Sequence, residues 1–229
     1  MKIPKIVNRV RRQLMQGLTK NIGRKSEITK FDSDQLPEIQ KILISRPNGR
    51  LGNLLLITPL LQDVIATFPN CKIDIMVKGG LAPILFENYK NVDKIIQLPK
   101  KPFKSLGKYA ASWISLRRKK YDLVINVSKN SSSGRLSTQF SKGRFKFFGD
   151  VTEEIKCNEQ MHIAKYPVYN LRIFLNRLGF PENKKPIPSL DLKLTSEEIT
   201  LGKKALQKIV KNDRKTICIF TYATGEKCY

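Results

Sequence analysis

One short loop, "RPNGRLGN", gathers side chains that can bind an anion. Its two arginines, Arg46 and Arg50, carry planar guanidinium groups that match a phosphate or carboxylate with paired hydrogen bonds. Gly49 and Gly52 permit a backbone close to a ligand, and a helix expected from about Asn53 would offer free backbone N–H groups to an anion. The residues favour equally an ordinary strand-to-helix turn with solvated arginines and Asn53 as the helix cap.

The same loop lacks a proton acceptor, because the amide of Asn53 cannot take a proton. A general base would have to come from another part of the same sheet edge. Asp150, Glu153 and Glu154 follow a different expected strand and are candidates by position alone. The single histidine, His162, precedes an expected helix, where a capping or packing role is favoured over catalysis.

Two further segments contain polar or basic side chains suited to ligands. The loop "SKNSSSGR" begins with Ser128 and Lys129, whose hydroxyl and ammonium groups suit a sugar or a phosphate, although a flexible turn explains it equally well. Residues 100–120 hold eight Lys and Arg, no acid, and the aromatic residues Tyr109 and Trp113. That mixture is typical of nucleic-acid or anionic-glycolipid binding, while a solvated helix face is the commoner origin of such a pattern.

The charge of the whole chain points to an anionic partner. The 229 residues include 43 Lys and Arg against 19 Asp and Glu, a formal charge of +24. Such a balance favours nucleic acid, acidic lipid or an anionic substrate without choosing among them. The four cysteines form no metal-binding pair and only one histidine is present, which favours reduced thiols and no metal site.

Residues 1–30 form a strongly basic N-terminal extension. They contain nine Lys and Arg against the single acid Glu27, with apolar residues at helical spacing. An amphipathic helix on anionic lipid and a solvated or disordered basic arm are both open. No run approaches the roughly 20 apolar residues that a membrane span needs, so the chain is expected in the cytoplasm, in contact with a membrane surface at most.

Short apolar strands alternate with helices from residue 41 onward. Strands are expected over 41–46, 72–77, 94–99, 122–127 and 144–149, and helices over 53–68, 81–87, 104–119 and 163–177. This alternation predicts an α/β fold with a parallel sheet covered on both faces. Ligands bind at the carboxyl ends of such strands, where the Arg46 and Ser128 loops would lie.

The remaining chain predicts the start of a second domain. A Pro-rich stretch leads to a helix opened by Thr195 with Glu198 three residues later, a capping-box spacing. The helix is expected to end near Asn212, and a strand is expected over 215–220. The expected organisation is a basic extension and linker (1–40), a ligand-binding domain (41–194), and a linker helix with the first strand of an incomplete domain (195–229), so the chain is expected to be a fragment.

A longer motif contains the anion-binding loop: R-x-x-G-x-x-G-N-x-L-L-x-T-P-L-L, followed by "FPNCKIDIMV". It resembles glycosyltransferase family 9, the ADP-heptose:lipopolysaccharide heptosyltransferases and their relatives. The likeness continues through "NVDKIIQLP", "YDLVINV", "MHIAKYPVYNLRIFLNRLGF" and "ICIFTYATGEKCY", and so covers about residues 41 to 229.

The resemblance implies a GT-B fold of two Rossmann-like domains, of which this chain would hold the N-terminal, acceptor-binding one and a truncated second domain. It implies an inverting, metal-independent transfer of a sugar, heptose in the first place, from a nucleotide-sugar such as ADP-heptose to a lipopolysaccharide-core or related surface-glycan acceptor, with no other cofactor. The enzyme would work at the cytoplasmic face of the inner membrane, which residues 1–30 would contact. The acceptor-binding residues implied are Arg46, Asn48, Gly49, Arg50, Gly52, Ser128 and Lys129. The donor-binding residues implied are Thr224 and Lys227.

One position departs from the family pattern. The resemblance implies an aspartate, taken as the catalytic base, where this chain has Asn53. Asn53 therefore stands at the catalytic position, and either another group acts as base or the chain is a non-catalytic glycan- or lipid-binding relative. As given, the chain is expected to be inactive. A basic nucleic-acid-binding protein is the least favoured alternative, since the cations are spread through an α/β pattern.

Overall fold

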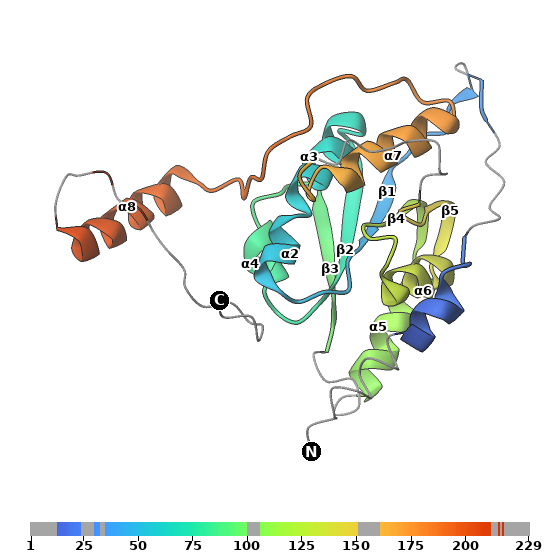
Figure 1. Cartoon of the computed structure of the whole chain (residues 1–229), viewed down its shortest axis with the longest axis horizontal. Helices are drawn as coiled ribbons and strands as arrows, with labels where there is room; N and C mark the ends of the chain where they lie inside the picture. The colour runs from blue at the N-terminus through green and yellow to red at the C-terminus, as the bar shows by residue number, and fades with distance from the viewer. Residues whose placement is uncertain are drawn as a thin grey trace. The chain divides into compact units, whose positions relative to one another are not determined.

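The computed structural model describes residues 13–23, 30–32, 35–99, 106–150, 161–211, 215 and 217. The chain divides into two compact units, Met1–Leu192 and Lys193–Tyr229, and each is described by itself. The first unit contains the sheet and both loops of interest, as Figure 1 shows.

A sheet of five parallel strands organises the described residues of the first unit. The strands are β1 (Lys41–Ser45), β2 (Lys72–Lys78), β3 (Val92–Leu98), β4 (Lys120–Asn126) and β5 (Lys142–Phe147). Their order is β3-β2-β1-β4-β5. The chain adds β2 and β3 on one side of β1, then crosses back and adds β4 and β5 on the other side of β1. The predicted α/β fold is confirmed, and the order places a topological switch point between β1 and β4, where such sheets bind ligands.

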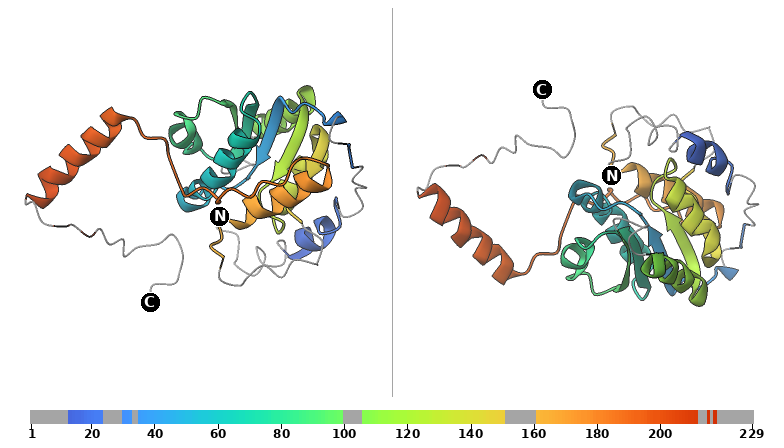
Figure 2. Two further views of the ribbon diagram at one scale, coloured as in Figure 1. Left: turned by 90° about the horizontal axis from the view of Figure 1, so that it is seen from above. Right: turned by 90° about the horizontal axis from the view of Figure 1, so that it is seen from below.

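Helices cover both faces of the sheet, as Figure 2 shows. They are α2 (Leu51–Leu55), α3 (Thr58–Thr67), α4 (Ala82–Phe86), α5 (Leu106–Arg118), α6 (Ser132–Phe140) and α7 (Tyr166–Arg177). The first three and α7 contribute side chains to one face, while α5 contributes to the other. The backbone at the start of β1 is fixed by β4, because the Asp122 carboxylate accepts hydrogen bonds from the N–H groups of Gln40 (2.9 Å) and Lys41 (2.8 Å).

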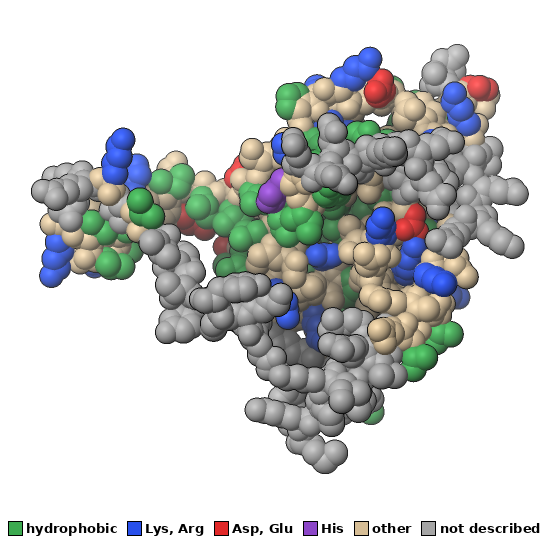
Figure 3. All heavy atoms as spheres, in the orientation of Figure 1, with side chains coloured by type: hydrophobic (Ala, Val, Ile, Leu, Met, Phe, Trp, Pro, Cys, Tyr) green, Lys and Arg blue, Asp and Glu red, His purple; other side chains and the backbone are tan. Residues whose placement is uncertain are grey.

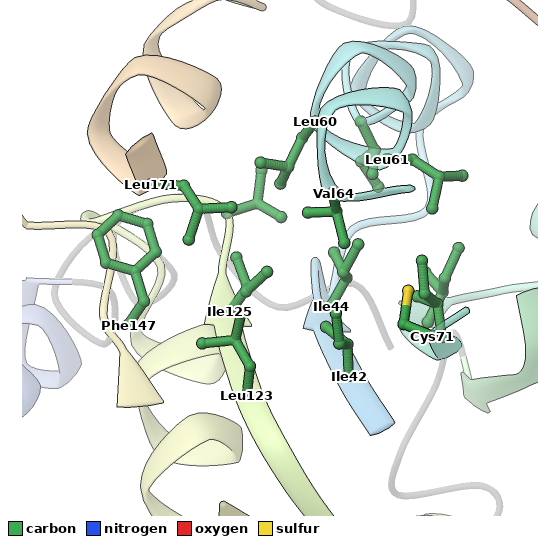
Figure 4. Close-up of a cluster of buried hydrophobic side chains, with 14 of the residues drawn as sticks. Ile42, Ile44, Leu60, Leu61, Val64, Cys71, Leu123, Ile125, Phe147 and Leu171 are labelled. Atoms are coloured by element: carbon green, nitrogen blue, oxygen red, sulfur yellow. The ribbon is translucent and has the colours of Figure 1, made fainter. Parts of the chain in front are cut away.

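Two apolar clusters fill the space between the sheet and its helices. In the larger one (Figure 4), Ile42 and Ile44 of β1 and Ile125 of β4 pack against Leu60 and Leu171 of the covering helices. The smaller cluster on the opposite face contains Leu43, Met76, Leu116 and Val124, with Tyr109 and Trp113 packed against it. Burial on both faces explains why β1, β2 and β4 are mainly apolar, whereas the edge strands β3 and β5 also carry exposed charged and polar residues.

The helix expected over residues 53–68 is two helices. The first, α2, begins two residues earlier and ends at Leu55, and α3 begins at Thr58 with Pro59 in its first turn. Proline is tolerated there because the first-turn N–H groups have no partner within the helix, so Pro59 begins a helix and does not bend one. The expected cap at Asn53 is also wrong: Arg50 precedes α2 and makes no side-chain capping bond.

The second unit contains α8 (Ser196–Val210), with the predicted capping box. The hydroxyl of Thr195 accepts from the N–H of Glu198 (3.2 Å), whose carboxylate accepts from the N–H of Thr195 (2.7 Å). The strand expected over 215–220 falls mainly outside the described residues. Within the described parts of the chain, no helix has the length and apolar character required to cross a membrane.

Candidate functional site

The loops after β1 and β4 leave the sheet from neighbouring residues. Ser45 and Asn126 are paired across the two strands, and the N–H of Val127 donates to the carbonyl of Ser45 at 3.2 Å. The Arg46 loop and the Ser128 loop therefore start side by side at the switch point. This is the arrangement that the parallel sheet predicts from the sequence.

Arg46 is a half-buried cation that lacks a carboxylate partner among the described residues. Its Nη2 donates to Oδ1 of Asn53 at 3.3 Å, and its buried Nε has no hydrogen-bond partner. Burial lowers the pKa of the guanidinium, because removing a charge from water disfavours the charged form. An anionic ligand at this position would supply both the missing acceptor and the missing opposite charge.

The backbone of the Arg46 loop is held by its own side chains and by β2. Asn48 accepts from the N–H of Arg50 through Oδ1 (3.0 Å), and its carbonyl accepts from the N–H of Lys78 (3.3 Å). A Cβ on Gly49 would lie under 3.0 Å from the backbone oxygen of Lys78, a separation that real Cβ atoms essentially never show. Asn48 and Gly49 thus shape the loop. Gly49 is needed because the loop backbone passes close to β2, whereas the sequence had indicated a close approach of the backbone to a ligand.

Gly52 and Arg50 face the space around the loop. A Cβ on Gly52 would have no heavy atom within 4 Å, and Arg50 is exposed. Both remain available to a ligand. The helix that follows has only five residues, so its N–H groups add little to an anion site, and the positive charge there comes from the arginines.

Lys78 is a cation at this edge that the sequence interpretation missed. It ends β2, directly beside the Arg46 loop, and is half-buried. The expected strand stopped one residue earlier. Had the strand been extended by that residue, the rule that parallel strands end at a common edge would have identified Lys78.

The loop after β4 is held in place by the buried side-chain amide of Asn126. Asn126 donates through Nδ2 to the carbonyls of Ser128 (2.9 Å) and Phe148 (2.8 Å). Ser131 caps α6, its hydroxyl accepting from the N–H of Gly134 at 3.1 Å. The side chain of Lys129 is exposed and that of Ser128 half-buried, so these two residues stand on an ordered support.

Asp150, a candidate base by position, has another partner. Its carboxylate forms an ion pair with Nη2 of Arg135, which is only 5% exposed. The carboxylate of Asp150 is therefore engaged in neutralising a buried guanidinium, and the structure gives it this role in the fold. Glu153 and Glu154 lie outside the described residues, as do the predicted donor-binding residues Thr224 and Lys227.

The other singled-out residues have structural roles. His162 is exposed, and its Nδ1 accepts from the N–H of Ala164 at 3.3 Å in the turn before α7, so it holds that turn and does not cap the helix, whose N-cap is Lys165. Tyr109 and Trp113 are partly buried against the smaller cluster, which gives them a packing role. Lys119 pairs with the buried Asp74 at 2.9 Å. No group of metal-binding side chains occurs among the residues that the structure describes.

On the described part of the face shown in Figure 3, blue Lys and Arg side chains are more prominent than red Asp and Glu. By sequence, neither 46–53 nor 127–131 contains an acid. An anion approaching either loop therefore meets no like charge from these residues.

These features define a Rossmann-like α/β fold, the kind of unit from which GT-B type glycosyltransferases are built. The structure is similar to a glycosyl transferase family 9 protein from Veillonella parvula (15% identity, TM-score 0.52), covering 80% of this chain and 52% of that one. It is also similar to the E. coli heptosyltransferase WaaC solved with ADP (18% identity, TM-score 0.51), covering 67% of this chain and 51% of that one. The chain thus spans about half the length of these two structures. No family model and no curated protein matches the sequence.

Proposed function

We propose that the chain is the acceptor-binding part of a glycosyltransferase that transfers a sugar from a nucleotide-sugar to an anionic glycolipid acceptor. The observation that carries the proposal is Arg46, a half-buried guanidinium at the switch point with an unpartnered Nε and no acidic partner among the described residues. The sequence resemblance and the fold of the two solved relatives support the reaction class. ADP-heptose is the first donor to test, since the E. coli relative is a heptosyltransferase solved with ADP.

In the proposed reaction, a hydroxyl of the acceptor displaces the nucleoside diphosphate directly at the anomeric carbon, with inversion and without a metal. Arg46 and Arg50 bind the acceptor's phosphate or carboxylate, Ser128 and Lys129 contact its sugar, and Gly52 leaves room for it. Thr224 and Lys227 bind the donor phosphates. The proposed place of action is the cytoplasmic face of the inner membrane.

The proton of the attacking hydroxyl needs an acceptor, and Asn53 cannot be it. Its amide oxygen already accepts from Arg46 at 3.3 Å. An amide in that position orients the guanidinium without neutralising it, so the positive charge stays available to the substrate. The base is then a group outside the two loops or a group on the substrate.

The test uses the full-length gene product, assayed for transfer from ADP-heptose and a panel of other nucleotide-sugars to a lipid A-core acceptor. Acceptor binding is measured in parallel by calorimetry. We expect Arg50→Ala to weaken acceptor binding roughly 10- to 100-fold, as for a lost hydrogen bond to a charged group. Arg118→Ala, which removes an exposed arginine of α5, is the matched control and should leave binding unchanged.

A second candidate function, a non-catalytic glycan- or lipid-binding protein, is favoured by the amide at Asn53. It predicts acceptor binding without transfer from any donor, both in wild type and in Asn53→Asp. Transfer by wild type would exclude it. Unchanged acceptor affinity in Arg50→Ala would contradict the anion clamp in either case.

A further inference from the structure

The helix over residues 13–19 and the turn over 20–23 have two chemically different sides. The side toward the protein holds Thr19, which is buried. The opposite side exposes large apolar side chains, with Leu14 62% and Leu18 76% exposed. Thr19 is the one buried residue of 13–20, so this short helix shields little of its own apolar surface.

The turn is attached firmly to the core of the domain. The carbonyl of Ile22 accepts from Nη1 of Arg135 at 2.9 Å. Gly23 has a φ of +83°, and its backbone packs so closely on the ring of Phe148 that a Cβ there would overlap it. A side chain other than glycine would be strained here both by the backbone conformation and by the ring.

Arg135 connects this turn to the candidate acceptor loop. Besides Ile22, its guanidinium donates through Nε to the carbonyl of Lys129 at 3.0 Å and pairs with Asp150. One buried side chain therefore fixes the backbone of the N-terminal turn and that of the loop relative to each other. The exposed leucines consequently belong to a surface anchored beside the candidate site.

The chemistry of this surface fits an anionic lipid bilayer. Two leucines four residues apart lie on the same side of a helix and can enter the acyl boundary together. By sequence, the first 30 residues carry nine Lys and Arg against one acid, which complements anionic headgroups. Nucleic acid would use the cations alone and gives no role to the leucines.

We propose that residues 13–23 dock the protein on an anionic bilayer and that Arg135 holds this docking segment beside the Ser128–Lys129 loop. The docking stands independently of sugar transfer. The placement beside an acceptor loop rests on the proposed function, to which it adds a partner: the bilayer that carries the glycolipid.

Co-sedimentation of the full-length protein with vesicles tests the docking. The vesicles are phosphatidylcholine with phosphatidylglycerol, compared with phosphatidylcholine alone. We expect binding to the anionic vesicles only, weakened at least about tenfold by Leu14→Glu with Leu18→Glu. The control, Leu81→Glu with Ile84→Glu, alters two exposed apolar residues at α4 with the same change of charge, and should bind within about threefold of wild type if docking depends on apolar insertion.

Leu14→Ser with Leu18→Ser removes the apolar surface without adding charge and should also weaken binding. The docking proposal would be overturned if wild type did not bind, if either leucine variant bound fully, or if the α4 control lost as much binding as the leucine variants. It would also be overturned if a generic oligonucleotide competed for binding while the leucine substitutions had no effect. Amide exchange in residues 128–131 should slow on vesicle binding in wild type and not in Asp150→Asn, and an unaltered rate in wild type would overturn the connection through Arg135. None of these readouts requires turnover, so a failed transfer assay and a failed docking assay are distinguishable.

Discussion

Two glycines in one loop are expected to respond oppositely to the same substitution. At Gly49, an added methyl group would lie under 3.0 Å from the backbone oxygen of Lys78, and a backbone atom cannot move aside as a flexible side chain can. At Gly52, the methyl group would have no heavy atom within 4 Å, and the residue lies inside α2 without a positive φ. Substituting the two glycines in turn therefore separates the effect of a steric clash, at Gly49, from the effect of helix propensity, at Gly52.

Gly49→Ala must push the loop away from the end of β2, which strains the hydrogen bond from Lys78 to Asn48 (3.3 Å). Overfilling a packed site typically costs about 1–3 kcal/mol, or about 2–4 °C in melting temperature per kcal/mol for a domain of this size. Gly52→Ala should instead stabilise the fold by up to about 1 kcal/mol, because alanine is the better helix former.

Urea unfolding followed by Trp113 fluorescence measures both effects, since the chain has a single tryptophan and it packs on the smaller apolar cluster. Acceptor binding gives the second readout. If a ligand approaches Gly52, alanine there should weaken binding while the fold remains stable. A Gly49→Ala protein as stable as wild type, or a Gly52→Ala protein destabilised as much, would refute the assignment of the two roles.

Further expected outcomes concern buried charges and one thiol. Arg172→Leu should lower the unfolding free energy by about 3–5 kcal/mol, because it leaves the buried Asp63 carboxylate without its ion pair; chemical denaturation measures this, and a loss below 1 kcal/mol would contradict it. Asp150→Asn should speed amide exchange in residues 128–131, since Arg135 loses its charged partner, and unchanged exchange would argue against that role. Burial raises the pKa of Cys71 to about 11, from 9.0 when exposed. The folded protein thus keeps a proton that the unfolded chain releases, and stability should fall from pH 9 to 11 by up to about 1.4 kcal/mol per pH unit, measured as a slope that Cys71→Ala reduces.

The fold was predictable from the sequence because its strands carry a strong local signal. The strands β1, β2 and β4 are short, mainly apolar runs, as a parallel sheet buried on both faces requires, whereas the edge strands β3 and β5 carry more polar residues and a weaker signal. The helix boundaries were less accessible. Residues 53–68 look like one helix in sequence, whereas the structure begins the first helix at Leu51 and a second one at Thr58, with Pro59 in its first turn.

The candidate site was predictable in location and less so in roles. Strand ends mark the loop positions, so Arg46 and Ser128 were identified correctly as neighbours at one edge. Two roles depend on contacts between residues distant in sequence, which a single sequence does not encode locally. They are the close approach of Gly49 to β2 and the ion pair of Asp150 with Arg135. The position of residues 13–23 beside the second loop depends on such a contact too, between residues 113 apart.

The central place of β1 in the sheet has a consequence for synthesis on the ribosome. Its partner β4 and the Asp122 carboxylate that binds its first N–H groups are made 81–82 residues later. At roughly 5–20 residues per second, that is an interval of about 4–16 s. Throughout it, one edge of β1 is open to pairing with other chains, so the nascent protein should depend on chaperones until β4 has left the ribosomal tunnel.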